Sequence, residues 1–208
     1  MLSEAMEREA AELAQRYGAP LRQTATLLDS RLFDPLSRPD RVGEVCMVIR
    51  RRNGKLLTAR KTFYPANAYR LLTGGIKHDE SILGALLRET EEETGLEVEV
   101  RRFLAVIDYA LQRPGEIGAA AQQRAARFHT FAFLLDEISG LLACYDPDER
   151  VEDFREVAVD ELPALAAQLE QLGQDFDPEI DGRWRDWGRF RAVVHRTVYQ
   201  TLSADDDR

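Results

Sequence analysis

Residues 74–96 read GGIKHDESILGALLRETEEETGL and combine a glycine pair, an apolar helical stripe and a run of glutamates. The periodic apolar residues predict a helix at about Ser81–Thr94, and the glycine that follows is typical of a helix end. At about 100° per residue, Glu89, Glu92 and Glu93 project into one arc, because positions i, i+3 and i+4 are neighbours on a helix. The stretch therefore predicts a helix with three converging carboxylates.

These three carboxylates repel one another at the helix C-terminus, where the helix dipole disfavours anions. Like-charged neighbours cost about 0.2–0.5 kcal/mol per pair even when exposed. A divalent cation offsets this cost, and Mg²⁺ uses few carboxylates and keeps positions for water and substrate phosphate. Arg88, four residues before Glu92, can hold one acid in place. The glycine pair lets the loop backbone pass close to the cluster, so the Gly74 carbonyl is a candidate further ligand.

A glutamate run alone is typical of a solvated helix face, but the spacing of the whole stretch favours a specific site. It resembles the box of the Nudix hydrolases, G-x5-E-x7-R-E-U-x-E-E-x-G-U, where U is aliphatic. The matching residues are Gly74, Glu80, Arg88, Glu89, Glu92, Glu93, Gly95 and Leu96. The probability of a chance match somewhere in the chain is on the order of 10⁻⁵. Thr90 departs from the pattern, and because it lies in the apolar stripe we expect a slight loss of stability and unchanged chemistry.

The resemblance implies an α/β (α+β) fold, an α/β/α sandwich with a mixed β-sheet. It covers residues 42–172 and leaves a helical N-terminal extension, residues 1–40, and a helical C-terminal extension, residues 173–208. It implies a hydrolase acting on acid anhydrides in phosphorus-containing substrates. The expected reaction is cleavage of a diphosphate linkage in a nucleoside diphosphate-linked small molecule, such as ADP-ribose or a related nucleotide. The alternative is a Nudix-fold ligand sensor or an interaction protein with weak or no catalysis.

The box alignment also implies roles for individual residues. Glu89, Glu92 and Glu93 would bind one or more Mg²⁺ or Mn²⁺ ions, and in some relatives the acid at the Glu89 position acts as the base instead. Arg88 would orient that acid. Hydrolysis of a diphosphate needs its charge neutralised and a water activated, and metal ions do both.

Many relatives take a further acid from a loop just before the last core strand. Glu149 and Glu152 are the candidates here, and Glu152 is preferred because of its distance from Phe154. Glu116, in the long loop at residues 112–126, is a third candidate. Each of them can equally be a solvated loop acid.

Three residues are candidates for substrate contact. Arg70 lies two residues ahead of the strand that leads into Thr73-Gly74, and Arg60, the second choice, lies at the end of its own strand. Either can meet a phosphate or be an ordinary surface arginine. Tyr64 can stack on a base or pack locally. The sequence does not identify the substrate.

The net charge of −9 and the pI near 5.0 argue against nucleic acid and anionic membranes as partners. An acidic protein that handles phosphates therefore needs a cation at its site. The chain has no apolar run long enough to span a membrane and no apolar signal core, so we expect a cytoplasmic protein. Cys46 and Cys144 lie in apolar contexts without a metal-ligand spacing, and we expect buried free thiols.

The remaining segments predict the rest of the architecture. An amphipathic helix carries one apolar stripe, which is either a homodimer interface or a face that covers its own domain: Leu2, Met6, Ala10, Leu13 and Tyr17. We expect a second short helical stretch through about Leu28 and then a proline-containing linker. Further strands are expected at Val45–Ile49, Leu56–Ala59, Leu96–Leu111, Phe128–Leu135 and Phe154–Val159, and helices at Asp160–Gly173 and Arg183–Leu202.

Overall fold

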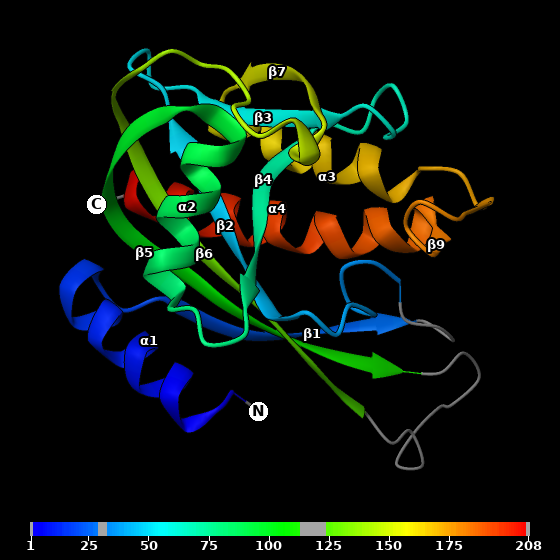
Figure 1. Ribbon diagram of the computed structural model, residues 1–208, viewed down its shortest axis with the longest axis horizontal. Coiled ribbons are helices and arrows are strands. Elements are labelled where there is room, and N and C mark those ends of the chain that lie inside the picture. Colours follow the sequence, from blue (N-terminus) through cyan, green and yellow to red (C-terminus); the bar gives the residue numbers. More distant parts are fainter. Residues whose placement is uncertain (1, 29–32, 113–123, 207–208) are drawn as a thin grey trace.

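The computed structural model of the protein describes residues 2–28, 33–112 and 124–206 (Figure 1). The strands of its main sheet are β1 (Leu21–Leu28), β2 (Arg41–Arg50), β3 (Leu56–Lys61), β4 (Arg70–Lys77), β5 (Leu96–Gln112), β6 (Arg124–Gly140) and β7 (Val151–Val157). They are ordered β1-β5-β6-β2-β4-β3-β7. Since β1–β5 and β2–β6 are parallel and the other neighbours antiparallel, the sheet is mixed.

Helices cover both faces of this sheet (Figure 1). They are α1 (Glu4–Tyr17), α2 (Ile82–Thr94), α3 (Leu162–Glu170) and α4 (Trp184–Asp206), and a small pair, β8 (Phe176–Asp177) and β9 (Gly182–Arg183), precedes α4. Buried residues of α1 and α2 share one apolar cluster with the sheet, and those of α3 and α4 share the other. The expected α+β fold with a mixed sheet is confirmed.

Helix α2 begins and ends where the sequence predicts, for local reasons. The hydroxyl of Ser81 accepts a hydrogen bond from the amide of Gly84 at 2.9 Å and caps the first turn. Gly95 adopts a left-handed φ of 63° and ends the helix. Thr90 is buried in the apolar stripe, and its hydroxyl donates to the carbonyl of Leu86 at 2.7 Å, so the departure from the box pattern leaves no unsatisfied polar group.

The prediction of a second helical stretch through Leu28 was wrong. Leu21–Leu28 form β1, which pairs in parallel with β5 from Leu21–Ala105 to Leu28–Gln112. Short segments have little intrinsic preference of their own, and hydrogen bonding to a neighbouring strand decides such cases. The segment at Leu96–Leu111, expected as one long strand or two short ones, is the single strand β5 with register shifts against β6.

The apolar stripe of α1 covers its own domain. Ala10 and Leu13 are buried in the cluster that also holds α2, and Leu2, Met6 and Tyr17 pack against it partly buried. The division of the chain into an extension at 1–40, a domain at 42–172 and a second extension at 173–208 stays a prediction. Segments of both extensions are part of one packed unit, since β1 is a strand of the main sheet and α4 packs on that sheet.

Two smaller expectations concern the cysteines and the membrane. Cys46 and Cys144 are free thiols, the first buried and the second half-buried. Across residues 2–28, 33–112 and 124–206, no helix has both the length and the apolar character needed to cross a bilayer.

Candidate active site

Strand β4 and helix α2 together place a glutamate against bare backbone. A Cβ added at Gly74 would lie 2.1 Å from Cγ and Cδ of Glu89, so only a glycine lets the Glu89 carboxylate lie there. The same strand continues into Gly75, where an added Cβ would lie 3.0 Å from Cζ of Arg41. Each glycine therefore makes room for a charged group.

Arg88 fixes the acids of this helix. Its Nη1 donates to Oε1 of Glu89 and Oε2 of Glu92, both at 2.8 Å. Its Nε and Nη2 donate to Glu80 at 2.7 and 2.8 Å, and Nη2 also donates to the carbonyl of Gly75 at 3.0 Å. Hydrogen bonding to Glu80 and then to Glu89 raises the pKa of Arg88 above its usual range despite partial burial. The hydrogen bonds to Glu89 and Glu92 are the contacts through which Arg88 would orient these acids, as the resemblance implies.

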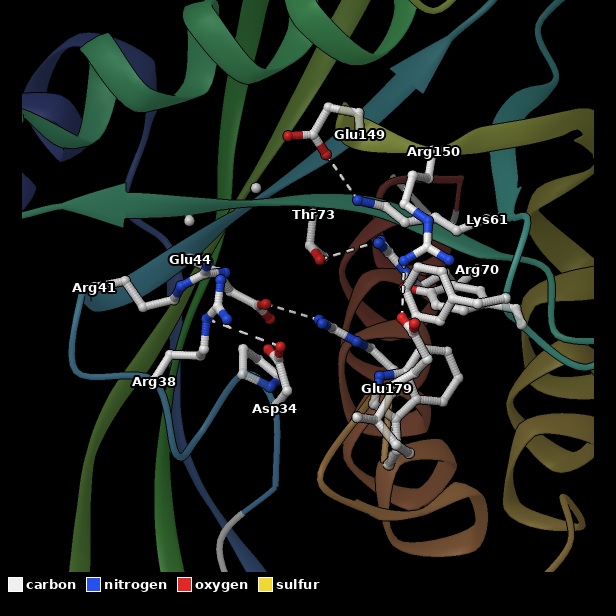
Figure 2. Close-up of a pocket in the computed structure, with 18 of the residues that line it drawn as sticks. Asp34, Arg38, Arg41, Glu44, Lys61, Arg70, Thr73, Glu149, Arg150 and Glu179 are labelled. Atoms are coloured by element: carbon white, nitrogen blue, oxygen red, sulfur yellow. Dashed lines mark hydrogen bonds and ion pairs between the residues drawn. The ribbon is translucent and has the colours of Figure 1, made fainter. Parts of the chain in front are cut away.

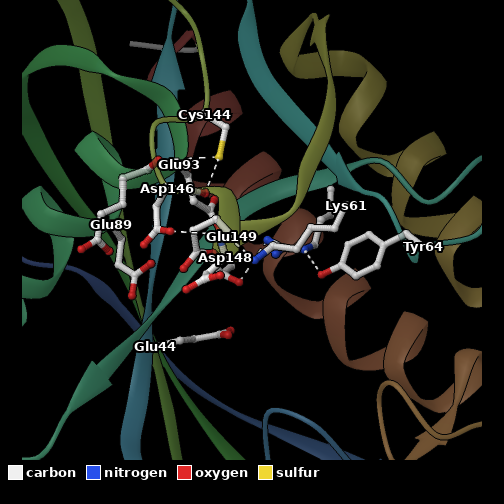
Figure 3. Close-up of polar contacts among 12 residues, drawn as sticks. Glu44, Lys61, Tyr64, Glu89, Glu93, Cys144, Asp146, Asp148 and Glu149 are labelled. Carbon is white, nitrogen blue, oxygen red and sulfur yellow. Dashed lines mark hydrogen bonds and ion pairs between the residues drawn. The ribbon is translucent and has the colours of Figure 1, made fainter.

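A third carboxylate comes from the loop before β7. One oxygen from each of Glu89, Glu92 and Glu149 lies within 4.8 Å of the others. Figure 3 shows Glu149 on the same side of the site as Glu89. Glu149 ends a short 3₁₀ turn, Pro147–Glu149, and Lys61 on β3 donates to it at 2.7 Å. Burial raises the pKa of Glu149, but the charge and hydrogen bond of Lys61 and the charge of Arg70 are among several contributions that together hold the pKa below its usual value. Glu149 is therefore ionised beside the helix acids.

Glu93 lies behind this group rather than in it. Its side chain is 1% exposed, and Oε1 has no hydrogen-bond partner among the described residues, although Nζ of Lys61 lies 3.3 Å away. Burial raises the pKa of Glu93, and the charges of Lys61 and Arg70 oppose that rise.

These groups fit a divalent cation that prefers oxygen ligands. Burial raises the pKa of Glu89 to about 7; Arg88 opposes the rise, and the charges of Glu93 and Glu149 add to it. The negative charge of the carboxylates is thus not fully neutralised by the cations of the protein. Among the described residues, Oε1 of buried Glu93 also has no hydrogen-bond donor. A hard cation such as Mg²⁺ matches this donor set.

The preferred loop acid, Glu152, lies elsewhere. Glu152 is outside the group of three, and its carboxylate pairs with Nη1 of Arg60 at 2.7 Å. Arg60 does not line the cavity beside the acids but carries Tyr69 under its guanidinium, at 5.7 Å from the ring centroid. Glu116 lies outside the described residues. A signal that favours Glu149 is the Asp146-Pro147 turn that precedes it, because the Asp146 side chain caps that turn.

A polar cavity of about 320 Å³ opens beside the acids (Figure 2). Arg70 lines it but is only 3% exposed, and its guanidinium donates to the hydroxyl of Tyr64, the carbonyl of Leu71 and the hydroxyl of Thr73. Tyr64 also lines it, at 8% exposed, with its ring packed edge-on against Trp187 at 4.7 Å. The predicted substrate contacts Arg70 and Tyr64 thus form part of the cavity wall.

Sequence reasoning identified Arg70 and Tyr64 but missed several basic cavity residues that also come from outside the box: Arg38, Arg41, Lys61, Arg150 and Arg191. Arg38 and Arg41 lie on one side, and Arg150 lies on the other with Lys61 and Arg70 (Figure 2). Helix α4 adds Arg191, whose Nη1 donates to Oε2 of buried Glu44 at 2.7 Å. Long-range pairing of this kind has no local sequence signal.

Helix α4 also holds β4 in place. The amide of Leu71 donates to Nε2 of His195 at 3.0 Å, and Nδ1 of His195 lies 2.8 Å from the carbonyl of Arg191. Since Nε2 accepts from an amide, the ring is neutral and its proton is on Nδ1. The strand that leads into the glycine pair is therefore hydrogen-bonded to the C-terminal helix.

A family model of the NUDIX domain matches residues 40–179, more than half of the chain. No curated protein matches the chain.

Solved structures with a similar course of the chain have low sequence identity. One is a UDP-X diphosphatase, 20% identical, covering 80% of this chain and 67% of that one, with a TM-score of 0.45. Another is an ADP-ribose pyrophosphatase from Streptococcus suis, 14% identical, covering 76% and 88%, with a TM-score of 0.44. A third is a MutT NUDIX hydrolase from Burkholderia pseudomallei, 21% identical, covering 76% and 95%, with a TM-score of 0.43.

The family match includes the whole glycine–glutamate stretch and the loop that carries Glu149. The chain therefore belongs to the Nudix hydrolases, a family that acts on phosphorus-containing anhydrides.

Proposed function

We propose that the protein is a Mg²⁺-dependent hydrolase that cleaves a diphosphate linkage in a nucleoside diphosphate-linked small molecule, such as ADP-ribose or a related nucleotide. The observation that carries this proposal is the group of carboxylate oxygens of Glu89, Glu92 and Glu149, within 4.8 Å of one another. Two of its members, Glu89 and Glu149, line the polar cavity. Membership of the Nudix family supports the same reaction class.

Glu89, Glu92 and Glu149 are the residues that would hold the ion, with Glu93 and the carbonyl of Gly74 as the further predicted ligands. When bound, Mg²⁺ or Mn²⁺ neutralises diphosphate charge and lowers the pKa of a bound water. Arg88 keeps Glu89 and Glu92 in fixed positions through its paired hydrogen bonds. Preorganised ligands reduce the cost of assembling the site during the reaction.

The test is release of phosphate or nucleotide from a substrate panel with and without Mg²⁺. The panel contains ADP-ribose, dinucleoside polyphosphates, nucleotide sugars, NADH and oxidised nucleoside triphosphates. We expect turnover of at least one compound that disappears when EDTA removes the metal. Absence of turnover across the panel, from a chain folded by circular dichroism, would contradict the proposal and favour a ligand sensor or an interaction protein.

Homodimer formation stays a prediction with a separate test. Because the apolar stripe of α1 packs on its own domain, it is not a free surface for a second copy. Size-exclusion chromatography with light scattering on the full chain decides this. A monomer at micromolar concentration would remove the dimer hypothesis without affecting the proposed hydrolysis.

A further inference from the structure

We propose that Arg38 and Arg41 form an anion subsite on the cavity wall beside the carboxylates, and that it binds a phosphate or carboxylate which the substrate carries in addition to the diphosphate that is cleaved. This inference rests on the proposed function and narrows its substrate class. Neither arginine lies in the glycine–glutamate stretch: Arg38 lies in the segment before β2, and Arg41 is the first residue of β2.

The guanidinium of Arg41 lies against the backbone of Gly75 in β4. A Cβ at Gly75 would lie 3.0 Å from both Cζ and Nη1 of Arg41, so the guanidinium fills the space that a side chain would take. The neighbouring residue, Gly74, has the Glu89 carboxylate in the corresponding place. Side chains alternate between the two faces of a strand, so Glu89 and Arg41 approach β4 from opposite faces. Both nevertheless line the same cavity, which is the space that a substrate held at Glu89 would share with Arg41.

Arg38 and Arg41 are only loosely paired within the protein. Their Nε atoms lie 3.5 and 3.3 Å from the same oxygen, Oδ1 of Asp40, and Nε of Arg38 lies 3.9 Å from Asp34. Two guanidinium groups around one carboxylate oxygen leave donors for another anion. Among the described residues, Asp40 is the only carboxylate within 4 Å of Arg41.

The remaining cations of the cavity are already used inside the protein. Lys61 pairs with Glu149 and Arg191 with Glu44, each at 2.7 Å, and Arg150 pairs with Glu179 at 2.8 Å. Arg70 donates to three protein groups and is almost completely buried. In the described part of the cavity, Arg38 and Arg41 are therefore the cations beside Gly74 and Gly75 that remain available to bind an anion.

The aromatic residues of the cavity do not offer a free ring for a base. Tyr64 and Trp187 are buried and pack edge-on against each other. The ring of Phe63 is covered by the guanidinium of Arg150, 4.4 Å from its centroid. The cavity, about 320 Å³, lies at the lower end of the range for small-molecule sites. Its chemistry suits a compact, multiply charged group better than a stacked base.

The first test measures anion binding without metal or turnover. Inorganic tripolyphosphate is titrated into the full chain in EDTA by calorimetry, with Arg41→Gln, Arg38→Gln and the control Arg101→Gln, an exposed arginine of β5 paired with Glu99. A charge-assisted hydrogen bond contributes about 1.5 kcal/mol or more, so we expect about tenfold weaker binding for Arg41→Gln and Arg38→Gln and unchanged binding for the control. Equal binding by all four chains, or no binding by the unaltered chain, would refute the subsite.

The second test identifies which end of the substrate carries the anion. NADPH differs from NADH by a phosphate on the nucleoside, and UDP-glucuronate differs from UDP-glucose by a carboxylate on the sugar. We expect kcat/KM to favour the more charged member of one pair about tenfold, and Arg41→Gln to reduce that ratio towards one. Equal kcat/KM within both pairs for the unaltered enzyme would overturn the inference while leaving the hydrolase assignment intact.

Discussion

Gly74 and Gly75 lie where two oppositely charged groups approach the same backbone. The Glu89 carboxylate occupies the side-chain space of the first, and the Arg41 guanidinium that of the second. A glycine pair was readable in the sequence, but which groups fill the space was not. Arg41 reaches it through the pairing of β2 with β4, a contact between strands that local spacing does not specify.

Gly74→Ala should reduce Mg²⁺-dependent turnover by on the order of 100-fold, because the new methyl group displaces the Glu89 carboxylate from its place. The clash is with the end of a side chain, so the fold should survive. Gly173→Ala is the control, since a Cβ there meets no atom within 4 Å. Steady-state kinetics and thermal unfolding of both variants provide the measurement. Full activity in Gly74→Ala would mean that the position of Glu89 is unimportant.

Glu149→Gln should lower kcat/KM by on the order of 100-fold, because it removes one of three converging carboxylates, whereas Glu152→Gln should change it less than threefold. The two variants make the same chemical change three residues apart, in the 3₁₀ turn for Glu149 and near the start of β7 for Glu152. The measurement is kcat/KM over a range of Mg²⁺ concentrations. A larger loss for Glu152→Gln would show that the loop acid predicted from sequence is the functional one.

At the scale of elements, α1 supports the start of α2. Both carboxylate oxygens of Glu9 accept hydrogen bonds from the first amides of α2, that of Ile82 at 2.9 Å and that of Leu83 at 3.1 Å. These amides have no partner within the helix, and a negative charge there also interacts favourably with the helix dipole. The N-terminal segment therefore stabilises the helix that carries the acids, although the family match begins only at residue 40.

Glu9→Ala should lower the free energy of unfolding by about 1 kcal/mol, the usual cost of removing a side-chain cap. Glu12→Ala is a matched control on the same helix, because its side chain is exposed. Urea denaturation followed by circular dichroism measures both. Equal stability of the two variants would show that the Glu9 contact contributes nothing.

At the scale of the whole molecule, α4 links the far end of the chain to the strand beside the site. His195 accepts the amide hydrogen of Leu71, and Arg191 pairs with Glu44 on β2. Burial, together with the charges of Arg70 and Arg191, lowers the pKa of His195 to about 4, although the hydrogen bond to the carbonyl of Arg191 opposes this shift. The neutral ring is therefore the form that the folded protein requires.

The stability of the fold should consequently depend on pH through His195. An exposed histidine has a pKa of about 6.5, so between about pH 6.5 and 4 the unfolded chain binds a proton that the folded chain does not. The contribution of this group to the free energy of unfolding falls as the pH falls, by up to about 1 kcal/mol per pH unit. Urea denaturation at pH 7 and pH 5 should show a larger loss for the unaltered chain than for His195→Gln. Equal losses in both chains would contradict this.

The spacing of residues 74–96 by itself determined the helix, its C-terminal glycine cap, the convergence of Glu89 and Glu92, and the family. These features depend on contacts three or four residues apart, which a sequence pattern specifies directly. Only the tertiary structure decided that Leu21–Leu28 form a strand and that Glu149 rather than Glu152 joins the acids. It also decided which arginines line the cavity. Those outcomes depend on the pairing of strands and on the packing of helices from distant parts of the chain. The residues that stabilise such contacts lie far apart in the sequence, so no short stretch of sequence specifies them.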